Sequence, residues 1–449
     1  MRTKRWLMFL ALACVGATWG CGRATSVTEE RAQLTASQHY IAFVERACDL
    51  VESDMAEITR VAEMAAARHI AGGMPGFAWN QQGMQDELWG RSGGLMHMGF
   101  NRPFERDRTE AERQLDVVLI NWQRDVFTEN LGTLKDMKAR GVHIIGFGPK
   151  AMPKLADYVA VCDTWFDTGF GADDRVVMMP DGSRAGRGNL LVSMLHGWAF
   201  TAEYISALTR RGKIPPIWQA YLYDEGIAWG DKYSGKMQFH DDLEVPPVEP
   251  GVLAGRFLDR IRALSRKLDR EQMESIRTAA DLVAAEKRAG RKTVCAAMGH
   301  APWTYVAQYE DQAWVEVSHF HSNISSQVDS HVRGTADGAL VLHLGYFGTD
   351  SKAIEVFESK QQRVMYISAD TPRDGEVGQF TGFVNKSVPD DAPAYINMGM
   401  RYGDACVELE GYPHRILPPS GIMQLVAYEC VNVEVLSRLL VETVEPGTE

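Results

Sequence analysis

The residues best suited to chemistry are a carboxylate and a histidine that each follow a short apolar run. Glu87 opens the segment Glu87-Leu-Trp-Gly-Arg91, and His300 follows the run from Thr293 to Met298. A buried carboxylate near a carbonyl carbon can move a proton between that carbon and the carbon next to it, and an imidazole can exchange a proton near neutral pH. The alternative for Glu87 is an ion pair with Arg91, four residues later. The alternative for His300 is a structural role in a loop.

Arg124 and Thr128 are candidate substrate-binding residues, because they follow the apolar run Val117 to Ile120. Arginine binds phosphate or carboxylate through its planar guanidinium group. The alternative is a surface salt bridge of Arg124 with Asp125 or Glu129.

Thr349 and Ser351 follow a second such run, Ala339 to Leu342. Hydroxyl groups beside a helix N-terminus bind anions, so both are candidate substrate-binding residues. Either could instead cap the helix that follows.

The two apolar runs are short and aliphatic, and they lack polar alternation. This pattern is typical of parallel strands that are buried on both faces. Open parallel sheets bind ligands beyond the carboxyl ends of their strands. We therefore expect the mouths of two equivalent sites at Asn121 to Asn130 and at Gly345 to Ser351.

The same order of elements occurs twice along the chain. Matched positions are separated by 218 to 222 residues, namely Ile58 with Ile276, Ala78 with Met298, Asp116 with Asp337 and Val142 with Val364. A nearly constant offset over several elements indicates an internal duplication.

We therefore predict an α/β fold class, with two tandem three-layer α/β/α domains that each contain a mainly parallel, flavodoxin-like sheet. The predicted parts are a signal peptide (1–20), a tether (21–36), a first domain (37–240), a linker (241–250), a second domain (251–440) and a tail (441–449).

Apolar spacing also predicts individual helices. In the second half it indicates one amphipathic helix from Phe257 to Leu268 and a second one from Ile276 to Val283. A long helix is expected from Asn189 to Arg210. Ser420 is expected to be the N-cap of the last helix.

Two segments carry a family resemblance. The stretch from Phe77 through Asn80 and Gln81 to Glu87-Leu-Trp-Gly-Arg-Ser-Gly-Gly-Leu95 resembles the strand, turn and Glu-x-x-x-Arg-Ala-Gly-Gly-Leu segment of sugar isomerase (SIS) domains. Met298-Gly299-His300-Ala301 is similar to the Gly-His-Ser turn of that family. The resemblance covers nearly all of residues 37–440. It implies an SIS-like fold, catalytic roles for Glu87 and His300, and substrate contacts from Asn80, Gln81 and Gly299.

The amino-acid composition limits the classes of molecule that this protein is expected to bind. The 449 residues are 45% hydrophobic and 24% charged, and the formal net charge is −12. Nucleic-acid binding requires a basic footprint, so nucleic acid is not expected as a partner.

The first residues predict export. Arg2, Lys4 and Arg5 precede an apolar run, from Trp6 to Trp19, that is shorter than the ~18 residues of a membrane span. This is typical of a secretory signal peptide. Cys21 follows this run after Gly20, so the protein is expected in the periplasm or cell envelope, either as a lipoprotein anchored at Cys21 or as a soluble exported protein.

The later cysteines are predicted to be reduced and mostly buried, because no pair has C-x-x-C spacing. No metal site is predicted. The glycine-rich loop Gly182 to Gly188 lacks the Lys-Ser/Thr ending of a phosphate-binding loop, and no cofactor is expected.

These observations favour an exported carbohydrate-derivative binding protein, for a sugar or a phosphosugar. The alternative is an aldose–ketose phosphosugar isomerase or an aminosugar isomerase or deaminase, so enzymatic activity is left open. Two features weigh against the enzyme: phosphosugars are mainly cytoplasmic, and the loop at Arg124 carries one hydroxyl where the family has several. The expected partner is a sugar-derived small molecule. A membrane contact is expected only through Cys21, and a homodimer is left open.

Overall fold

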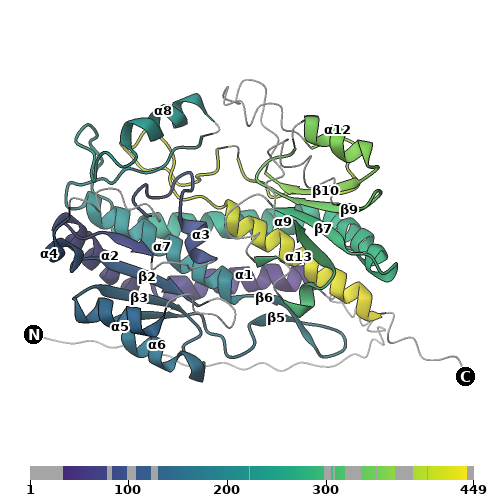
Figure 1. The fold of residues 1–449 in the computed structure, drawn as a ribbon, viewed down its shortest axis with the longest axis horizontal. Helices are drawn as coiled ribbons and strands as arrows, with labels where there is room; N and C mark the ends of the chain where they lie inside the picture. The colour runs from purple at the N-terminus through teal and green to yellow at the C-terminus, as the bar shows by residue number, and fades with distance from the viewer. Residues whose placement is uncertain are drawn as a thin grey trace, which may run out of the picture. The chain divides into compact units, whose positions relative to one another are not determined.

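The computed structural model describes residues 34–77, 83–98, 108–122, 130–221, 223–297, 305–306, 309–318, 335–349, 351–369, 388–401 and 403–441 (Figure 1). The signal peptide, Cys21 and most of the predicted tether and tail lie outside these residues. The helices are α1 (Ala36–Ser53), α2 (Met55–Ile70), α3 (Met84–Leu88), α4 (Glu110–Arg113), α5 (Leu131–Ala139), η2 (Pro153–Leu155), α6 (Ala156–Val161), α7 (Asn189–Thr209), α8 (Asp224–Tyr233), α9 (Val252–Arg288), η3 (Glu310–Gln312), α12 (Ser351–Ser359) and α13 (Ser420–Val441).

The first sheet contains β1 (Pro75–Phe77), β2 (Val117–Asn121), β3 (His143–Gly148) and β4 (Thr164–Asp167), in that spatial order. All neighbouring strands in it are parallel. All five residues of β2 are buried, as the unbroken apolar run predicts. Figure 1 shows α5 and α6 on one side of the sheet and α7 on the other. A hairpin of β5 (Arg175–Met178) and β6 (Arg184–Arg187) follows this sheet.

The second sheet contains β7 (Thr293–Ala297), β8 (Val315–Ser318), β9 (Leu340–Leu344), β10 (Arg363–Ser368) and β11 (Tyr395–Asn397). The spatial order is β11-β10-β9-β7-β8, and every pair is parallel. This is the flavodoxin-like order, in which the second strand of the chain lies outside the first. Helix α12 packs on one face and α9 and α13 on the other (Figure 1). The predicted α/β class with parallel, flavodoxin-like sheets is therefore confirmed.

The strands of the two sheets run in corresponding order. The first sheet has the order of the second without a strand equivalent to β8 among the described residues. The predicted offset relates β2 to β9. In the first sheet β2 lies between β1 and β3, and in the second sheet β9 lies between β7 and β10. The duplication and its domain boundaries stay a prediction.

The two halves of the sequence share one core. The largest buried cluster includes Val44 of α1, Trp198 of α7, Ile261 of α9 and Val426 of α13. Helices α1, α7, α9 and α13 pack against one another (Figure 1), so each half buries apolar surface against the other.

Helix α9 corrects one prediction. It is a single helix of 37 residues, where apolar spacing had indicated two. The segment between Leu268 and Ile276 contains neither glycine nor proline, so nothing in it ends a helix. Leu268 and Ile276 are eight residues apart and therefore lie on the same helical face.

Helix α13 corrects a second prediction. It begins at Ser420 itself, so Ser420 is the first helical residue and not the residue before it. The helix expected from Asn189 to Arg210 is confirmed as α7.

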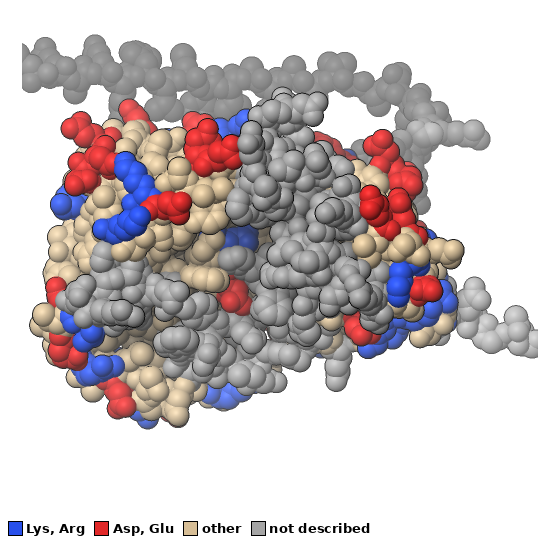
Figure 2. Space-filling view, turned by 45° about the horizontal axis from the view of Figure 1, so that its top comes forward, with Lys and Arg blue, Asp and Glu red and all other residues tan. Residues whose placement is uncertain are grey.

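The remaining sequence features have simple outcomes. All five described cysteines are free; Cys48, Cys295 and Cys430 are buried, and Cys162 and Cys406 are half-buried. Among the helices of the described segments, none has both the length and the apolar character needed to cross a membrane. Figure 2 shows acidic and basic side chains interspersed over the described part of one face.

Candidate functional site

Glu87 is a buried carboxylate on the short helix α3, which follows β1. Its side chain is fully buried, and Oε1 accepts a hydrogen bond of 3.1 Å from the indole Nε1 of Trp198 on α7. Oε2 has no hydrogen-bond partner among the described residues and lies 3.8 Å from Nη2 of Arg91. Burial raises the pKa of Glu87 to about 7, although Arg91 and the Trp198 hydrogen bond lower it. The ion pair offered as an alternative is therefore confirmed, and the carboxyl group titrates near neutral pH.

Arg91 joins this carboxylate to the second half of the chain. Its Nη2 lies 3.6 Å from Oδ2 of Asp404 and donates a hydrogen bond to the hydroxyl of Ser420. Asp404 accepts hydrogen bonds from the backbone N–H of Ser420 (3.3 Å) and from its hydroxyl (2.8 Å). A carboxylate at a helix N-terminus is stabilised by the free backbone N–H groups there, so Asp404 caps α13. We call Glu87, Arg91, Asp404 and Ser420 the buried quartet.

The quartet holds more negative than positive charge. It places two carboxylates around one guanidinium group, and the side chains of Arg91 and Asp404 are only 8% and 10% exposed. Burial raises the pKa of Asp404, against the opposing effects of Arg91 and Ser420. When both carboxylates are ionised, the quartet has a net charge of −1.

Two glycines allow this close approach between the halves. A Cβ atom on Gly421 would lie 1.8 Å from Oε2 of Glu87. Gly93 has a φ of +84°, and a Cβ there would lie 2.7 Å from both Cβ of Ala405 and the backbone N of Leu417. Only glycine fits such positions without moving its neighbours. Gly93, the first glycine of the pair that carries the family resemblance, therefore has a packing reason in this chain.

The loop after β9 positions Asp404. The hydroxyl of Tyr346 accepts a hydrogen bond from the backbone N–H of Asp404 (2.5 Å) and donates one to the carbonyl of Arg401 (2.8 Å). Asp404 itself has a φ of +70°, which a residue other than glycine adopts at an energetic cost. Tyr346, in the predicted loop after β9, thus supports the segment that follows β11.

A cleft opens beside Asp404, beyond the carboxyl end of β11. Its volume is about 620 Å³, and α9 forms one wall while residues 400–419 form the other. Four guanidinium groups face three carboxylates in its lining, which suits an anionic ligand. We call it the arginine cleft; its charged residues are Arg256, Asp259, Arg260, Arg401, Asp404, Glu408 and Arg415. Asp404 belongs to both the cleft and the buried quartet.

Among the predicted site residues, Glu87 and Thr349 have described side chains, and neither lines a described cleft. Thr349 is buried, and its hydroxyl lies 3.0 Å from the hydroxyl of Tyr366 on β10. Ser351 is the first residue of α12. The other predicted residues lie outside the described residues: Asn80, Gln81, Arg124, Thr128, Gly299 and His300. The predicted catalytic and substrate-binding roles stay predictions.

The sequence reasoning missed the residues of the arginine cleft. Arg256 and Arg260 lie four residues apart, with Asp259 and Ala263 on the same face of α9. That spacing was visible in the sequence as a charged stripe on an amphipathic helix. The left-handed backbone of Asp404 had no distinctive sequence signal, because aspartate adopts this conformation much less often than glycine does.

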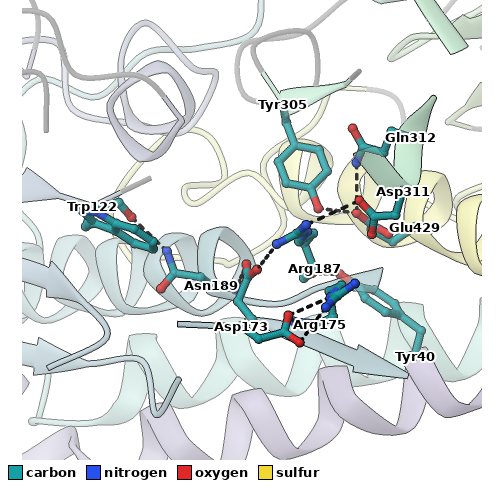
Figure 3. Close-up of polar contacts among 11 residues, drawn as sticks. Tyr40, Trp122, Asp173, Arg175, Arg187, Asn189, Tyr305, Asp311, Gln312 and Glu429 are labelled. Carbon is teal, nitrogen blue, oxygen red and sulfur yellow. Dashed lines mark hydrogen bonds and ion pairs between the residues drawn. The ribbon is translucent and has the colours of Figure 1, made fainter. Parts of the chain in front are cut away.

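A second polar cluster, partly buried, lies at the hairpin (Figure 3). Arg187 of β6 lies 2.8 Å from Asp174 and 3.6 Å from Asp311, while Tyr305 donates a hydrogen bond to Glu429 of α13. Burial raises the pKa of Glu429 to about 7, against the hydrogen bond from Tyr305. We call these five residues the hairpin cluster, and they tie the hairpin to α13.

The fold and these contacts define an α/β protein with two parallel sheets and a polar site near the carboxyl end of β11. No protein-family model and no curated protein matches the sequence. Solved structures that resemble this chain include a candidate phosphosugar isomerase from Silicibacter pomeroyi DSS-3, with 11% identity, coverage of 91% of this chain and 98% of that one, and a TM-score of 0.43.

A candidate sugar-binding protein from Salmonella typhimurium LT2 has 9% identity, coverage of 89% of this chain and 99% of that one, and a TM-score of 0.44. A candidate phosphosugar isomerase from Clostridium difficile 630 has 8% identity, coverage of 90% and 93%, and a TM-score of 0.44. These likenesses are too distant to assign an activity to this chain.

Proposed function

We propose that this chain is an exported binding protein for an anionic sugar derivative, and that the arginine cleft holds the ligand. The observation that carries the proposal is the excess of guanidinium groups in a cleft beyond the end of a parallel strand. Arginine binds phosphate and carboxylate groups through two parallel N–H donors. The carboxylates in the same lining can accept hydrogen bonds from sugar hydroxyls.

The sugar and the export parts of the proposal rest on the sequence. The segment from Glu87 to Leu95 resembles a sugar isomerase motif, and Met1 to Gly20 has the pattern of a signal peptide. Export weighs against a phosphosugar isomerase, because phosphosugars are mainly cytoplasmic metabolites.

The proposal is tested by binding and thermal-shift measurements on purified protein. Glucose 6-phosphate and glucuronic acid should raise the melting temperature, and glucose should not, because a ligand stabilises the folded state that binds it. Arg260→Ala should weaken binding by roughly 10-fold to 100-fold, as expected for the loss of a charged hydrogen bond. Arg270→Ala is the matched control, because Arg270 lies on the same helix and its side chain is 64% exposed. Equal binding of glucose and the two anions would contradict the proposal, as would equal losses in the two variants.

A second candidate function, sugar isomerisation, is supported by the resemblance of the segment from Glu87 to Leu95 to the sugar isomerase motif and by the position of Glu87 after β1. A carboxyl group with a pKa of about 7 is matched to general acid–base catalysis at neutral pH. As a base it would take the proton from C2 of an open-chain sugar and return it to C1. The test is exchange of the C2 hydrogen with deuterium in heavy water, followed by NMR on glucose 6-phosphate. Exchange that disappears in Glu87→Gln would support the enzyme, and no exchange in the wild type would leave only the binding role.

A further inference from the structure

A second cleft adjoins the arginine cleft. It also has a volume of about 620 Å³, and the loop of residues 408–415 forms its wall. We call it the loop cleft. Arg256, Glu408 and Arg415 line both clefts, so the two lie side by side with these three side chains between them.

The boundary between the clefts is made of weakly held surface groups. Arg415 donates a 2.7 Å hydrogen bond to Glu408, and their side chains are 35% and 77% exposed. Exposed ion pairs of this kind contribute little stability. Arg256 donates a long hydrogen bond of 3.4 Å to the carbonyl of Glu408. A ligand with its own charged and hydroxyl groups can therefore replace these contacts and lie across both clefts.

The loop cleft has a fixed wall of different chemistry. The hydroxyl of Tyr412 accepts a 3.0 Å hydrogen bond from the backbone N–H of Ile217, and Nε2 of His414 lies 3.3 Å from the carbonyl of Ile217. The indole of Trp229 packs edge-on against the ring of His414, with 4.9 Å between centroids. Burial lowers the pKa of His414 to about 4, so its imidazole is neutral near pH 7. A wall held in this way is organised before a ligand arrives, which reduces the entropic cost of binding.

The two clefts differ in charge, and this difference determines which part of a ligand each cleft would bind. The arginine cleft has an excess of guanidinium groups. The loop cleft adds to the three shared residues a carboxylate, Glu410, and a neutral imidazole, His414. Hydroxyl groups of an uncharged sugar can donate hydrogen bonds to the exposed carboxylate of Glu410. The His414 ring adds an uncharged surface, because its Nε2 faces the carbonyl of Ile217 and its Nδ1 is buried.

The volumes of the two clefts also favour a ligand with more than one sugar unit. Sites for drug-sized ligands occupy roughly 300–1,000 Å³, and a single sugar ring is smaller than such ligands. Each cleft alone can take a sugar unit with its substituent, so together they exceed what a monosaccharide fills.

We infer that the ligand is a linear anionic oligosaccharide of at least two units, with its anionic unit in the arginine cleft and a neutral sugar unit in the loop cleft. This inference rests on the proposed function and names its substrate class.

The test compares two pairs of probes by calorimetry with the full mature chain. One pair is glucuronic acid and an aldobiouronic acid, in which the uronic acid is linked to one neutral sugar. The other pair is glucose 6-phosphate and the 6′-phosphate of cellobiose. In at least one pair the disaccharide should bind 10-fold or more tightly than its monosaccharide. Equal affinities within both pairs would overturn the inference and leave the proposed function standing, whereas no binding of any probe would overturn both.

Substitutions distinguish the contributions of the two clefts to binding. Glu410→Ala changes an exposed side chain of the loop cleft and should weaken the disaccharide by 5-fold or more while leaving the monosaccharide unchanged. Arg256→Ala should weaken both, because Arg256 lines both clefts. An equal loss of both probes in Glu410→Ala would overturn the assignment of a separate neutral subsite.

Discussion

Glu87 should make the stability of the protein depend on pH between about 4.5 and 7. The pKa of its carboxyl group is raised from 4.5 to about 7, chiefly by burial. Below pH 4.5 the folded and unfolded chains both carry the proton. Between the two pKa values the unfolded chain releases the proton while the folded chain keeps it. The contribution of Glu87 to the free energy of unfolding is therefore present at low pH and is lost as the pH rises to about 7.

The size of this effect follows from the shift. Each pKa unit corresponds to 1.36 kcal/mol, so a change from 4.5 to about 7 gives about 3 kcal/mol. Glu87→Gln keeps the shape of the side chain and removes the titration. The difference in unfolding free energy, wild type minus Glu87→Gln, should fall by about 3 kcal/mol between pH 4.5 and pH 8.

Denaturant unfolding at pH 4.5, 5.5, 6.5, 7.5 and 8 measures this difference. Glu249→Gln, at an exposed position before α9, is the matched control for removing one carboxylate from the chain. If the difference between wild type and Glu87→Gln stays constant over this range, the burial argument for Glu87 is refuted.

Three further changes test the packing around these carboxylates. Gly421→Ala should lower the free energy of unfolding by about 1–3 kcal/mol, because its methyl group would overlap the Glu87 carboxylate. Gly255→Ala is the control, because no atom lies within 4 Å of the new methyl group; in thermal unfolding it should be neutral or stabilising. Trp198→Phe removes a hydrogen bond that lowers the pKa of Glu87, so the midpoint of the stability change should move to higher pH, and an unchanged midpoint would contradict this. Glu429→Gln should show the same sign and pH window as Glu87→Gln, because the pKa of Glu429 is also raised to about 7; a stability difference that grows with pH would contradict it.

The parallel sheets could be predicted because their central strands have a direct sequence signature. β2 and β9 are buried along their whole length, so neither contains the polar alternation that a strand with one wet face requires. The position of Glu87 after β1 was predictable for the same reason, because the element order placed it beyond a strand end. Helix α9 shows the limit of apolar spacing, which finds a buried face but not a continuous helix.

The buried quartet could not be assembled from the sequence. Glu87 and Arg91 are separated by more than 300 residues from Asp404 and Ser420, and periodicity reports only local geometry. The contact depends on Gly421 lying against Oε2 of Glu87 and on the left-handed backbone of Asp404. Both features are set by tertiary packing between the two halves, so no local pattern reveals them.

The quartet and the hairpin cluster correspond at the long helix that each contacts, although their arginines come from different elements. Asp174 accepts a hydrogen bond from the first backbone N–H of α7, at Asn189 (3.3 Å), just as Asp404 does from the first backbone N–H of α13. Each of these aspartates also pairs with an arginine, Asp174 with Arg187 in the one case and Asp404 with Arg91 in the other.

The tenth residue of each long helix completes the correspondence. In α7 it is Trp198, which donates to the carboxylate of Glu87 from the segment after β1. In α13 it is Glu429, whose carboxylate accepts from Tyr305 in the segment after β7. The donor and the carboxylate have exchanged places between helix and loop, while the position of the interaction is kept. We propose that both clusters come from the duplication indicated by the offsets of 218 to 222 residues. In each half a buried carboxylate needs a hydrogen-bond donor, because a buried carboxylate without one would be costly. This need is met whether the carboxylate lies on the helix and the donor on the loop or the reverse, so the interaction can keep its position while the two partners exchange elements.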